Sequence, residues 1–300
     1  MLNLKSDIPF TNYFRIFNII SLILILISLG SIFYKGLNFG VDFKGGTLIE
    51  LRVENNEIRI SEIREAFLKM NLGDVNVKRF GKEGDYLIKF EKTKSNDENF
   101  IENIKDKLFK NMGVNFNFRR VEKVGPKVSG ELLRAGLIAI VLSLAAMLIY
   151  IWIRFEWQFS LGAIIALFHD VIITIGFFSI LEFEINLSII AAVLTIVGYS
   201  MNDTVVIFDR VRENLKKYTS KKIDEISNLS INETLSRTII TSLTTLLALL
   251  SIFFFGGTIL HGFSFAMILG VIFGTYSSIF IANPILIKLK VNQKSVLKED

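Results

Sequence analysis

Apolar residues occur in six long blocks along the chain, and charged residues are concentrated between them. A helix needs about 20 residues to cross the hydrocarbon core of a bilayer, so each block predicts a membrane-spanning helix. The first block is too long for an ordinary signal-peptide core and no small-residue cleavage site follows it, which predicts an uncleaved anchor. The predicted spans are Ile16–Tyr34, Leu137–Ile153, Phe159–Leu181, Ile185–Phe208, Ile239–Phe255 and Phe263–Ile287.

Basic residues are distributed unevenly among the short connections between the spans. The connection after the fourth span and the C-terminal tail are rich in Lys and Arg, whereas the connections after the third and fifth spans contain neither. Lys and Arg near span ends stay in the cytoplasm, so both termini are predicted to be cytoplasmic, in a multi-pass protein of the cytoplasmic (inner) membrane. The predicted organisation is a tail at 1–15, a first span at 16–35, an extracytoplasmic (periplasmic) domain at 36–133, five further spans at 134–290 and a tail at 291–300.

The long segment after the first span has the pattern of a small α+β domain. Thr47–Val53 alternates like a half-buried strand, and Ile60–Asn71 has apolar residues at helical spacing. The remaining predicted elements are strands at Val75–Phe80 and Tyr86–Phe90, a helix at Asn96–Lys110 and a strand at Val114–Val121. The order β-α-β-β-α-β is ferredoxin-like. The predicted fold is therefore an all-α bundle of six transmembrane helices with a small ferredoxin-like domain between helices 1 and 2. The fold alone does not give this domain a function, and a stable spacer is the alternative.

Composition narrows the classes of function. The chain has no cysteine, which excludes disulfides and thiol chemistry. Its net charge of +5 is interpreted as membrane topology, not as nucleic-acid binding. No nucleophile constellation, metal-ligand cluster or nucleotide-binding loop is visible, so we expect neither an enzyme nor a bound cofactor.

Asp203 lies inside the fourth predicted span, six residues before Asp209, where the charged connection begins. At 1.5 Å per helical residue, Asp203 lies roughly 9 Å above the inner end of the span. An ionised carboxylate at that depth costs several kcal/mol unless it is paired or protonated. Asp203 is therefore predicted to bind and release protons. The alternatives are a structural ion pair and a helix that ends earlier.

Arg237, at the inner end of the fifth span, is the predicted partner of Asp203. A long basic side chain near a helix end can reach along the bundle, although a topology anchor is the alternative. Hydroxyl side chains recur after it along one helix face: Thr238, Thr241 or Ser242, and Thr245. Such a face favours a helix interface or a hydrated pathway over a surface against lipid, and ordinary helix–helix hydrogen bonding would also explain it.

His169 and Asp170 are adjacent ionisable residues near the middle of the third span. Adjacent residues point about 100° apart on a helix, so we do not expect these two side chains to bond each other. They could latch onto neighbouring spans or form a proton relay, because histidine titrates in the useful range. In the sixth span, Gly270 and Gly274 form a small-xxx-small pair, which predicts close contact with another helix in this chain or in a partner.

Four stretches together resemble a known family. Gly40–Thr47, His169–Thr174, Gly198–Asn214 and Arg237–Ser242 look like the signature stretches of the SecF family of Sec translocase subunits. The similarity covers nearly the whole chain. The first stretch, with Gly40, Asp42, Gly45 and Gly46, is interpreted as a structural junction between the anchor and the outer domain, because paired glycines allow tight turns.

The resemblance implies an architecture similar to half of a resistance-nodulation-division transporter. Members pair with SecD, which supplies another six spans, and associate with the SecYEG channel and YajC. They use the proton-motive force to help complete export of unfolded preproteins after SecA has driven the early, ATP-dependent part. Carried over, the proton-responsive site is Asp203 with Arg237, and we place Asn202, Asp170 and His169 in the same proton-coupling set, with protons as the coupling ion.

Two other functions compete with this interpretation. A proton-coupled exporter of small molecules or lipids from the same superfamily would need a second six-span half, because this chain has one half and a small outer domain. A non-transporting scaffold would make Asp203→Asn and Arg237→Met silent. The resemblance implies no nucleic-acid partner.

Overall fold

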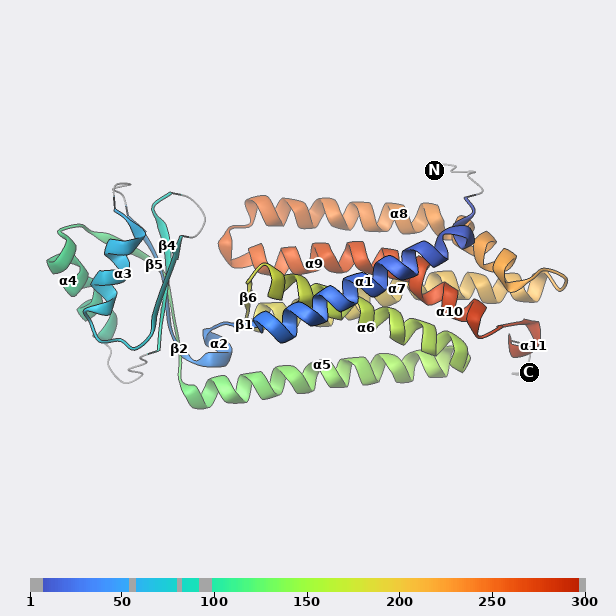
Figure 1. Cartoon of the computed structure of the whole chain (residues 1–300), viewed down its shortest axis with the longest axis horizontal. Helices are drawn as coiled ribbons and strands as arrows, with labels where there is room; N and C mark the ends of the chain where they lie inside the picture. The colour runs from blue at the N-terminus through green and yellow to red at the C-terminus, as the bar shows by residue number, and fades with distance from the viewer. Residues whose placement is uncertain (1–7, 54–57, 80–82, 92–98, 297–300) are drawn as a thin grey trace. The chain divides into compact units, whose positions relative to one another are not determined.

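The computed structural model describes residues 8–53, 58–79, 83–91 and 99–296. The chain divides into two compact units (Figure 1). One unit comprises Met1–Asn38 and Ile138–Asp300, and the other comprises Phe39–Leu137. The first unit is helical, and the second is built around a β-sheet.

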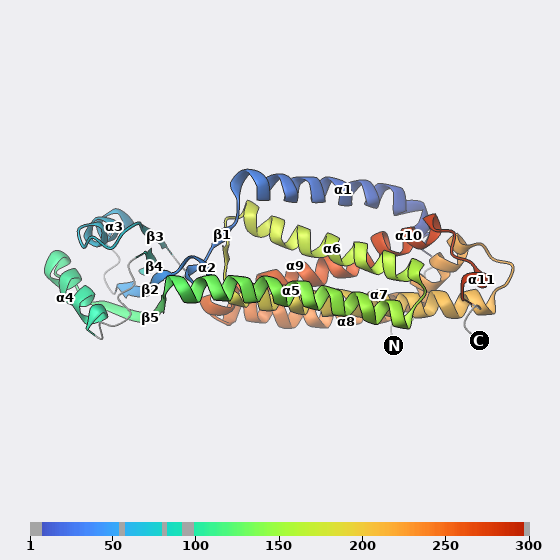
Figure 2. The ribbon, with the colours of Figure 1, turned by 90° about the horizontal axis from the view of Figure 1, so that it is seen from below.

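Long apolar helices make up the first unit and lie with their axes roughly aligned (Figures 1 and 2). Among the described residues, six helices are long and apolar enough to cross a membrane, which confirms the predicted number of spans. Their bounds are α1 Phe10–Lys35, α5 Pro126–Arg154, α6 Trp157–Ile180, α7 Leu187–Lys217, α8 Ile223–Phe255, and a sixth span, Leu260–Lys288, that includes most of α9 (Thr258–Ser277) and α10 (Asn283–Lys288). A short helix, α11 (Gln293–Val296), follows.

The α7–α8 hairpin extends well beyond the predicted apolar blocks. α7 continues to Lys217 and α8 begins at Ile223, so a short turn stands where the sequence predicted a long charged connection. Hydropathy misses these extensions because their exposed faces are charged while one stripe is apolar. That stripe is buried, as shown by Val211, Leu215, Ile226 and Ile231.

The sixth span contains a π-helical turn, Ser278–Ala282 (η1), between α9 and α10. Pro284 has no N–H, so it cannot donate the regular bond to the carbonyl of Phe280. The side chain of Asn283 donates to the carbonyl of Ser278, the first residue of this turn, at 2.8 Å. Turns of this kind occur frequently at functional sites.

Glycines allow the helices to approach closely. A Cβ atom at Gly270 would lie 2.3 Å from the side chain of Ile196, and one at Gly274 would lie 3.0 Å from Ser200. The predicted close contact of the sixth span is therefore confirmed, and its partner is α7 of the same chain. Gly176 of α6 has the same role against α1, because a Cβ there would lie 2.2 Å from Ser28.

The second unit contains a four-stranded antiparallel sheet in the order β3-β4-β2-β5. Its elements follow the predicted order of strand, helix, strand, strand, helix, strand. They are β2 Gly46–Val53, α3 Ile60–Leu68, β3 Val75–Arg79, β4 Asp85–Phe90, α4 Phe100–Met112 and β5 Phe116–Val124. The predicted strand end at Phe80, the first two residues of the turn that follows it, Gly81 and Lys82, and the start of the second helix at Asn96 lie outside the described residues.

The core of this unit lies between the sheet and its two helices. Ile49, Leu51 and Ile88 of the sheet and Phe67 and Leu108 of the helices are completely buried. On the face of β2 opposite that core, Arg52 donates to both carboxylate oxygens of Asp85 at 2.6 Å. These hydrogen bonds to Asp85 raise the pKa of Arg52 above its ordinary value.

The glycine-rich stretch lies in the chain between α1 and β2. β1 (Asn38–Phe39) pairs with β6 (Glu184–Ile185), and α2 (Val41–Lys44) follows β1. Asp42 lies in the first turn of α2, and Gly40 precedes it with extended backbone. Gly45 and Gly46 have φ values of 75° and 116°, which favour glycine, and a Cβ at Gly46 would lie 2.7 Å from the carbonyl oxygen of Phe90.

Candidate functional site

Asp203 is buried on α7, with 4% of its surface exposed. The hydroxyl of Thr275 on α9 donates to its Oδ2 at a long distance of 3.5 Å. That hydroxyl is also bonded at 2.7 Å to Ser242 on α8, whose hydroxyl lies within reach of the same carboxylate. Hydroxyl groups from two neighbouring helices, α8 and α9, therefore face Asp203 and hold it loosely.

Arg237 and Asn202 are exposed on the surface of the helical unit. Among the described residues, no ion pair within 4 Å joins Arg237 to Asp203, although Arg237 is near enough for its charge to act on that carboxylate. The predicted partner is thus close to Asp203, without direct contact in this structure. Asn202 precedes Asp203 on α7 and points away from the buried face that Asp203 occupies.

The hydroxyl stripe of α8 is divided between two environments. Thr238 and Ser242 are buried, and Ser242 bonds across to α9. Thr241 and Thr245 bond back to carbonyls of their own helix, at distances of 2.8 to 3.0 Å. Part of the stripe is therefore a helix interface, as predicted, and part is ordinary bonding within one helix.

Asp170 is fully buried on α6 and is held tightly. Ser200 of α7 donates to its Oδ2 at 2.6 Å, and Ser277 of α9 donates to the same oxygen at 2.7 Å. Its other oxygen lies 2.8 Å from Nδ1 of His169. Short hydrogen bonds from two other helices converge on this carboxyl group, so it ties α6, α7 and α9 together.

The expectation that His169 and Asp170 do not bond each other is wrong. The rule for adjacent residues describes where side chains leave the helix, and it does not describe how they turn afterwards. The Asp170 side chain is short and Nδ1 is the ring nitrogen nearest the backbone, so these two atoms can meet close to the helix. The His169 ring is also stacked on Tyr276, with centroids 5.8 Å apart. Its Nε2 is buried and has no hydrogen-bond partner among the described residues.

The two carboxylates are coupled through the same pair of helices. Ser200 and Asp203 lie three residues apart on α7, and Thr275 and Ser277 lie two residues apart at the end of α9. Sequence reasoning did not single out Ser200, Thr275 or Ser277 as partners, because serine and threonine are common in membrane helices. The sequence indicates these partners only indirectly, because a buried carboxylate needs hydrogen-bond donors around it.

Ion pairs gather at the end of the helical unit that carries the α7–α8 turn. Arg154 bonds to Asp209 at 2.8 Å, Arg212 lies 3.1 Å from Glu156, and Arg210 bonds to Glu233 at 2.6 Å. These pairs link the ends of α5, α6, α7 and α8. Arg210 and Arg212 belong to the basic stretch that predicts membrane topology, and the structure adds that their ion pairs fasten helix ends together.

Within the described residues, no group of three or more His, Cys, Asp or Glu side chains could hold a metal ion. The polar side chains buried inside the described helical unit include carboxylates, hydroxyls, carboxamides and the imidazole of His169. Such groups can bind, release and exchange protons.

Comparison with known proteins defines the class. Residues 104–292 match the family model "Protein export membrane protein SecD/SecF, C-terminal", and residues 30–57 match the SecD/SecF GG motif. The second match covers the glycine-rich junction with Gly45 and Gly46. Six candidate membrane helices and these matches define a multi-pass membrane protein of protein export.

Individual relatives agree with this class. The chain is 50% identical over 285 residues to "Protein translocase subunit SecF" of Rickettsia bellii, covering 94% of this chain and 93% of the relative, and 48% identical over 298 residues to that of Rickettsia conorii, covering 97% and 96%. The chain belongs to the SecF family of protein translocase subunits. It also resembles the crystal structure of SecDF, a translocon-associated membrane protein from Thermus thermophilus, with a TM-score of 0.88 and 34% identity over 97% of this chain and 40% of that one.

Proposed function

We propose that this chain uses the proton-motive force, together with SecD, to promote late steps of protein export across the cytoplasmic membrane. Membership of a translocase family supports a role in export. In this proposal both termini are cytoplasmic and residues 36–133 form an extracytoplasmic domain, which we assign to the ferredoxin-like fold because of its strand order. The tails at 1–15 and 291–300 flank the spans at 16–35 and 134–290.

The observation that carries the proposal is the loose setting of Asp203. A buried carboxylate is stable when charged only if donors or cations surround it. Asp203 has the hydroxyl of Thr275 at 3.5 Å, that of Ser242 within reach, and a nearby arginine that forms no ion pair with it within 4 Å. The cost of charging it is therefore only partly offset, and a small movement of α8 or α9 would change the balance between its charged and neutral forms. That property suits a proton-loading group.

Asp170 and His169 have a different role in this proposal. The bonds from Ser200 and Ser277 hold the Asp170 carboxylate in one arrangement, so we assign it as a latch that keeps α7 and α9 in register beside Asp203. His169 orients Asp170 from the other side. Asp170 and His169 thus contribute to proton coupling through position, while Asp203 carries the proton.

SecD is the proposed partner at the face where Arg237 and Asn202 are exposed. A charged side chain and an amide are poor neighbours for lipid, so we expect this face to be covered by another protein. The solved SecDF chain supports the choice, because this chain spans 40% of its length. We also propose that this chain associates with the SecYEG channel and YajC. It acts after SecA has driven the early part of export, and its substrates are unfolded preproteins.

The movement of several protons across the membrane can supply the energy for a conformational change in this chain. One charge crossing 100 mV of membrane potential releases about 2.3 kcal/mol. Shifting a two-state equilibrium from 1:99 to 99:1 needs about 5.5 kcal/mol. We therefore expect several protons for each export event.

The test uses inverted membrane vesicles that contain this chain with SecD. SecA starts translocation, ATP is removed, and completion of the trapped preprotein is followed with and without an imposed proton gradient. We expect the gradient to drive completion with the wild-type chain and not with Asp203→Asn at equal protein level. If both chains respond alike, Asp203 is structural and the scaffold function is favoured.

A further inference from the structure

Consecutive residues at the end of α9 contact different parts of the helical unit. Thr275 donates to the loosely held Asp203 at 3.5 Å, and Ser277 donates to the tightly held carboxylate on α6 at 2.7 Å. Between them, Tyr276 turns to α1, where its hydroxyl donates to the carbonyl oxygen of Phe17 at 2.7 Å. Less than one helical turn therefore joins both buried acids to α1.

The side chain of Tyr276 is held from two sides. A phenol has a single proton, which goes to the Phe17 carbonyl, so the 2.7 Å bond between Ser21 and Tyr276 is donated by the serine. The ring of Tyr276 is stacked on that of His169, with centroids 5.8 Å apart and planes 22° apart. Tyr276 therefore connects α1 to the imidazole that bonds Asp170.

One face of α1 packs against this segment and the π-helical turn that follows it. Phe10, Phe14 and Phe17 recur at helical spacing, and each ring centroid lies within 6.2 Å of that of Phe280 in η1. Ser21, four residues further along this face, is buried. Apolar contacts are not directional and tolerate small shifts, whereas hydrogen bonds have a narrow geometry. The hydrogen bonds of Tyr276 therefore decide how closely α1 follows the end of α9.

The π-helical turn η1 begins directly after Ser277. Such a turn interrupts the regular hydrogen-bond pattern of a helix and occurs frequently at functional sites. Helices in switching proteins shift by about 1–2 Å between two packed arrangements. A shift of this size at Thr275 would be enough to convert its long bond to Asp203 into a normal one. It would displace Tyr276 as well, because the two residues are adjacent on one turn.

Two other helices bring ionisable groups to this segment. Arg237 on α8 acts on Asp203 through its charge, without an ion pair within 4 Å among the described residues. On α6, His169 and Asp170 bond each other, and Ser277 also bonds Asp170. Because the α6 pair is firmly bonded and Asp203 is not, a change of charge is expected at Asp203.

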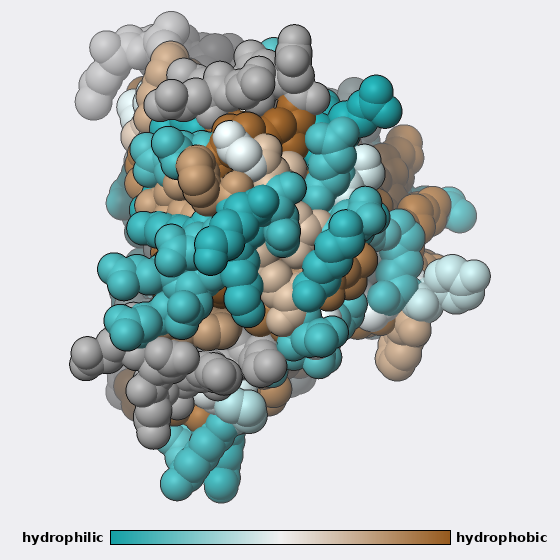
Figure 3. All heavy atoms as spheres, turned by 90° about the vertical axis from the view of Figure 1, so that its left-hand side faces the viewer, coloured by the Kyte–Doolittle hydropathy of each residue, from teal (hydrophilic) through white to brown (hydrophobic). Residues whose placement is uncertain are grey.

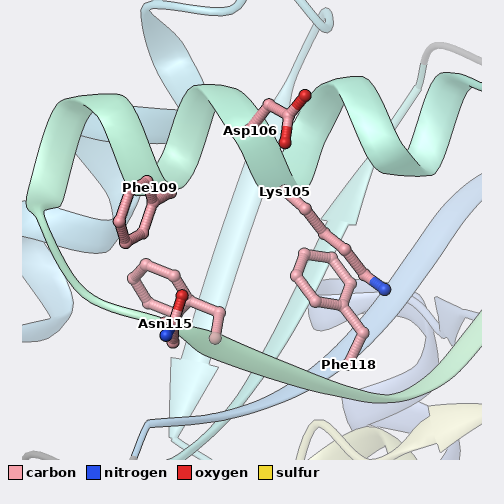
Figure 4. Close-up of a pocket in the computed structure, with 6 residues that line it drawn as sticks. Lys105, Asp106, Phe109, Asn115 and Phe118 are labelled. Atoms are coloured by element: carbon pink, nitrogen blue, oxygen red, sulfur yellow. The ribbon is translucent and has the colours of Figure 1, made fainter.

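α1 is also the helix that precedes the sheet-containing unit in the chain. It ends at Lys35, and the sheet-containing unit begins at Phe39. Figure 3 looks onto this unit and shows hydrophilic side chains over much of the face, with apolar residues between them. A pocket of about 260 Å³ opens between α4 and β5, where Lys105 and Phe109 extend from α4 toward the strand (Figure 4). α1 thus links the apolar helices to a part of the chain that is built for water.

We propose that Tyr276 is a positioning residue of proton coupling, which transmits the protonation state of Asp203 to α1. When Asp203 is charged, Thr275 donates to it and Tyr276 holds α1 in the arrangement described above. When Asp203 is neutral, its carboxyl group needs that donor less, the end of α9 relaxes, and the hydrogen-bonded Tyr276 carries α1 with it. This inference rests on the proposed function in proton-coupled export, and it adds the path by which the proton acts on the rest of the chain.

The test measures proton flux and preprotein completion together, in liposomes that contain this chain with SecD and the translocation channel. SecA starts translocation, ATP is removed, and a proton gradient is imposed. Tyr276→Phe keeps the aromatic ring and removes the hydroxyl that bonds α1. We expect flux close to that of wild type and about fivefold less completion for the same flux, which is the size of effect expected from the loss of one hydrogen bond.

Ser31→Ala is the matched control, because it removes a different hydroxyl bond between α1 and the bundle. The Oγ atom of Ser31 lies 2.9 Å from that of Ser179 on α6. Completion for the same flux should equal that of wild type in this control. A merely structural defect lowers flux and completion in proportion, so it leaves this ratio unchanged. An unchanged ratio with Tyr276→Phe would overturn the inference, and so would an equal loss with Ser31→Ala.

A milder variant serves if Tyr276→Phe does not fold. Ser21→Ala removes one bond to the Tyr276 hydroxyl and leaves the bond from that hydroxyl to the Phe17 carbonyl. Completion for the same flux should fall by about twofold, because only the weaker of the two restraints on α1 is lost. If Tyr276→Phe does not fold, a ratio unchanged by Ser21→Ala overturns the inference.

The two proposals fail separately. If Asp203→Asn abolishes flux and completion while Tyr276→Phe leaves their ratio unchanged, Asp203 remains the proton carrier and the role of Tyr276 is rejected. If Tyr276→Phe lowers the ratio while Asp203→Asn is as active as wild type, the link to α1 remains and Asp203 is rejected as the proton carrier.

Discussion

Two carboxylates lie buried in the helical unit, and their surroundings differ in strength. Asp170 is bonded at 2.6 to 2.8 Å by Ser200, Ser277 and His169. Asp203, less than one helical turn from Ser200 on α7, receives a hydrogen bond from Thr275 at 3.5 Å. The same helices therefore satisfy one acid almost fully and leave the other loosely held.

This difference indicates how an intramembrane acid can have one of two roles. A carboxylate with short bonds from several helices holds those helices together, because breaking any bond leaves a buried group unsatisfied. A carboxylate with weak bonds can change its protonation state at little cost to the fold. Depth in the membrane does not distinguish the two roles, whereas the hydrogen-bond partners do.

The largest expected effect is on coupling, from Asp203→Asn. The amide cannot bind and release a proton, so gradient-driven completion of a trapped preprotein should be lost. Asp209→Asn is the matched control, because Asp209 lies on the same helix in a partly exposed ion pair with Arg154. Such pairs are worth about 0–1 kcal/mol, so the control should retain gradient-driven completion.

The largest expected effect on stability comes from Asp170→Ala. Removing this carboxylate leaves the hydroxyls of Ser200 and Ser277 without their acceptor, at a cost of about 3 kcal/mol. In detergent, the apparent Tm should fall by several degrees, measured as loss of the monodisperse protein after heating. Asp203→Ala should lower the apparent Tm much less. An equal fall for both variants would remove the distinction between a latch and a loosely held acid.

The contact between α7 and α9, which positions both acids, is tested at two glycines. Gly270→Ala places a methyl group 2.3 Å from the Ile196 side chain and should cost about 1–3 kcal/mol. Gly198→Ala, on α7, meets no atom within 4 Å and should be neutral or slightly stabilising, because alanine favours helix more than glycine does. A melting comparison that gave the opposite order would show that this contact is not close.

The smallest effect on the chain alone is expected from Arg237→Met. Arg237 is exposed and has no ion pair within 4 Å among the described residues, so its loss should change the free energy of unfolding by less than about 0.5 kcal/mol. In vesicles with SecD, gradient-driven completion should nevertheless fall. A variant as active as wild type in that assay would indicate that Arg237 is a topology anchor.

Much of the fold follows from the sequence because its signals are local. Apolar blocks predicted the spans, and alternation predicted the strand and helix order of the sheet-containing unit. The extensions of α7 and α8 were missed because hydropathy reports contact with lipid, whereas these turns bury one stripe against each other. The π-helical turn before Pro284 was missed as well, since nothing in the apolar pattern of this block distinguishes a π-helical turn from a regular one.

The candidate site shows where sequence reasoning reaches its limit. Ionisable residues within apolar blocks are conspicuous, so Asp203, Asp170 and His169 could be selected. Their partners could not, because hydrogen bonds between α6, α7 and α9 depend on helix rotation and on contacts such as Gly274 against Ser200. The bond between His169 and Asp170 was wrongly excluded for the same reason: side-chain rotation overrode a rule about backbone geometry.

The most direct test of the central claim measures proton flux in liposomes that contain this chain reconstituted with SecD and the translocation channel. A pH-sensitive dye inside the liposomes reports flux after a gradient is imposed, for wild type, Asp203→Asn and the exposed control Asp209→Asn. The account predicts flux for wild type and for Asp209→Asn, and none above that of empty liposomes for Asp203→Asn. Undiminished flux with Asp203→Asn would contradict the assignment of Asp203 as the proton carrier.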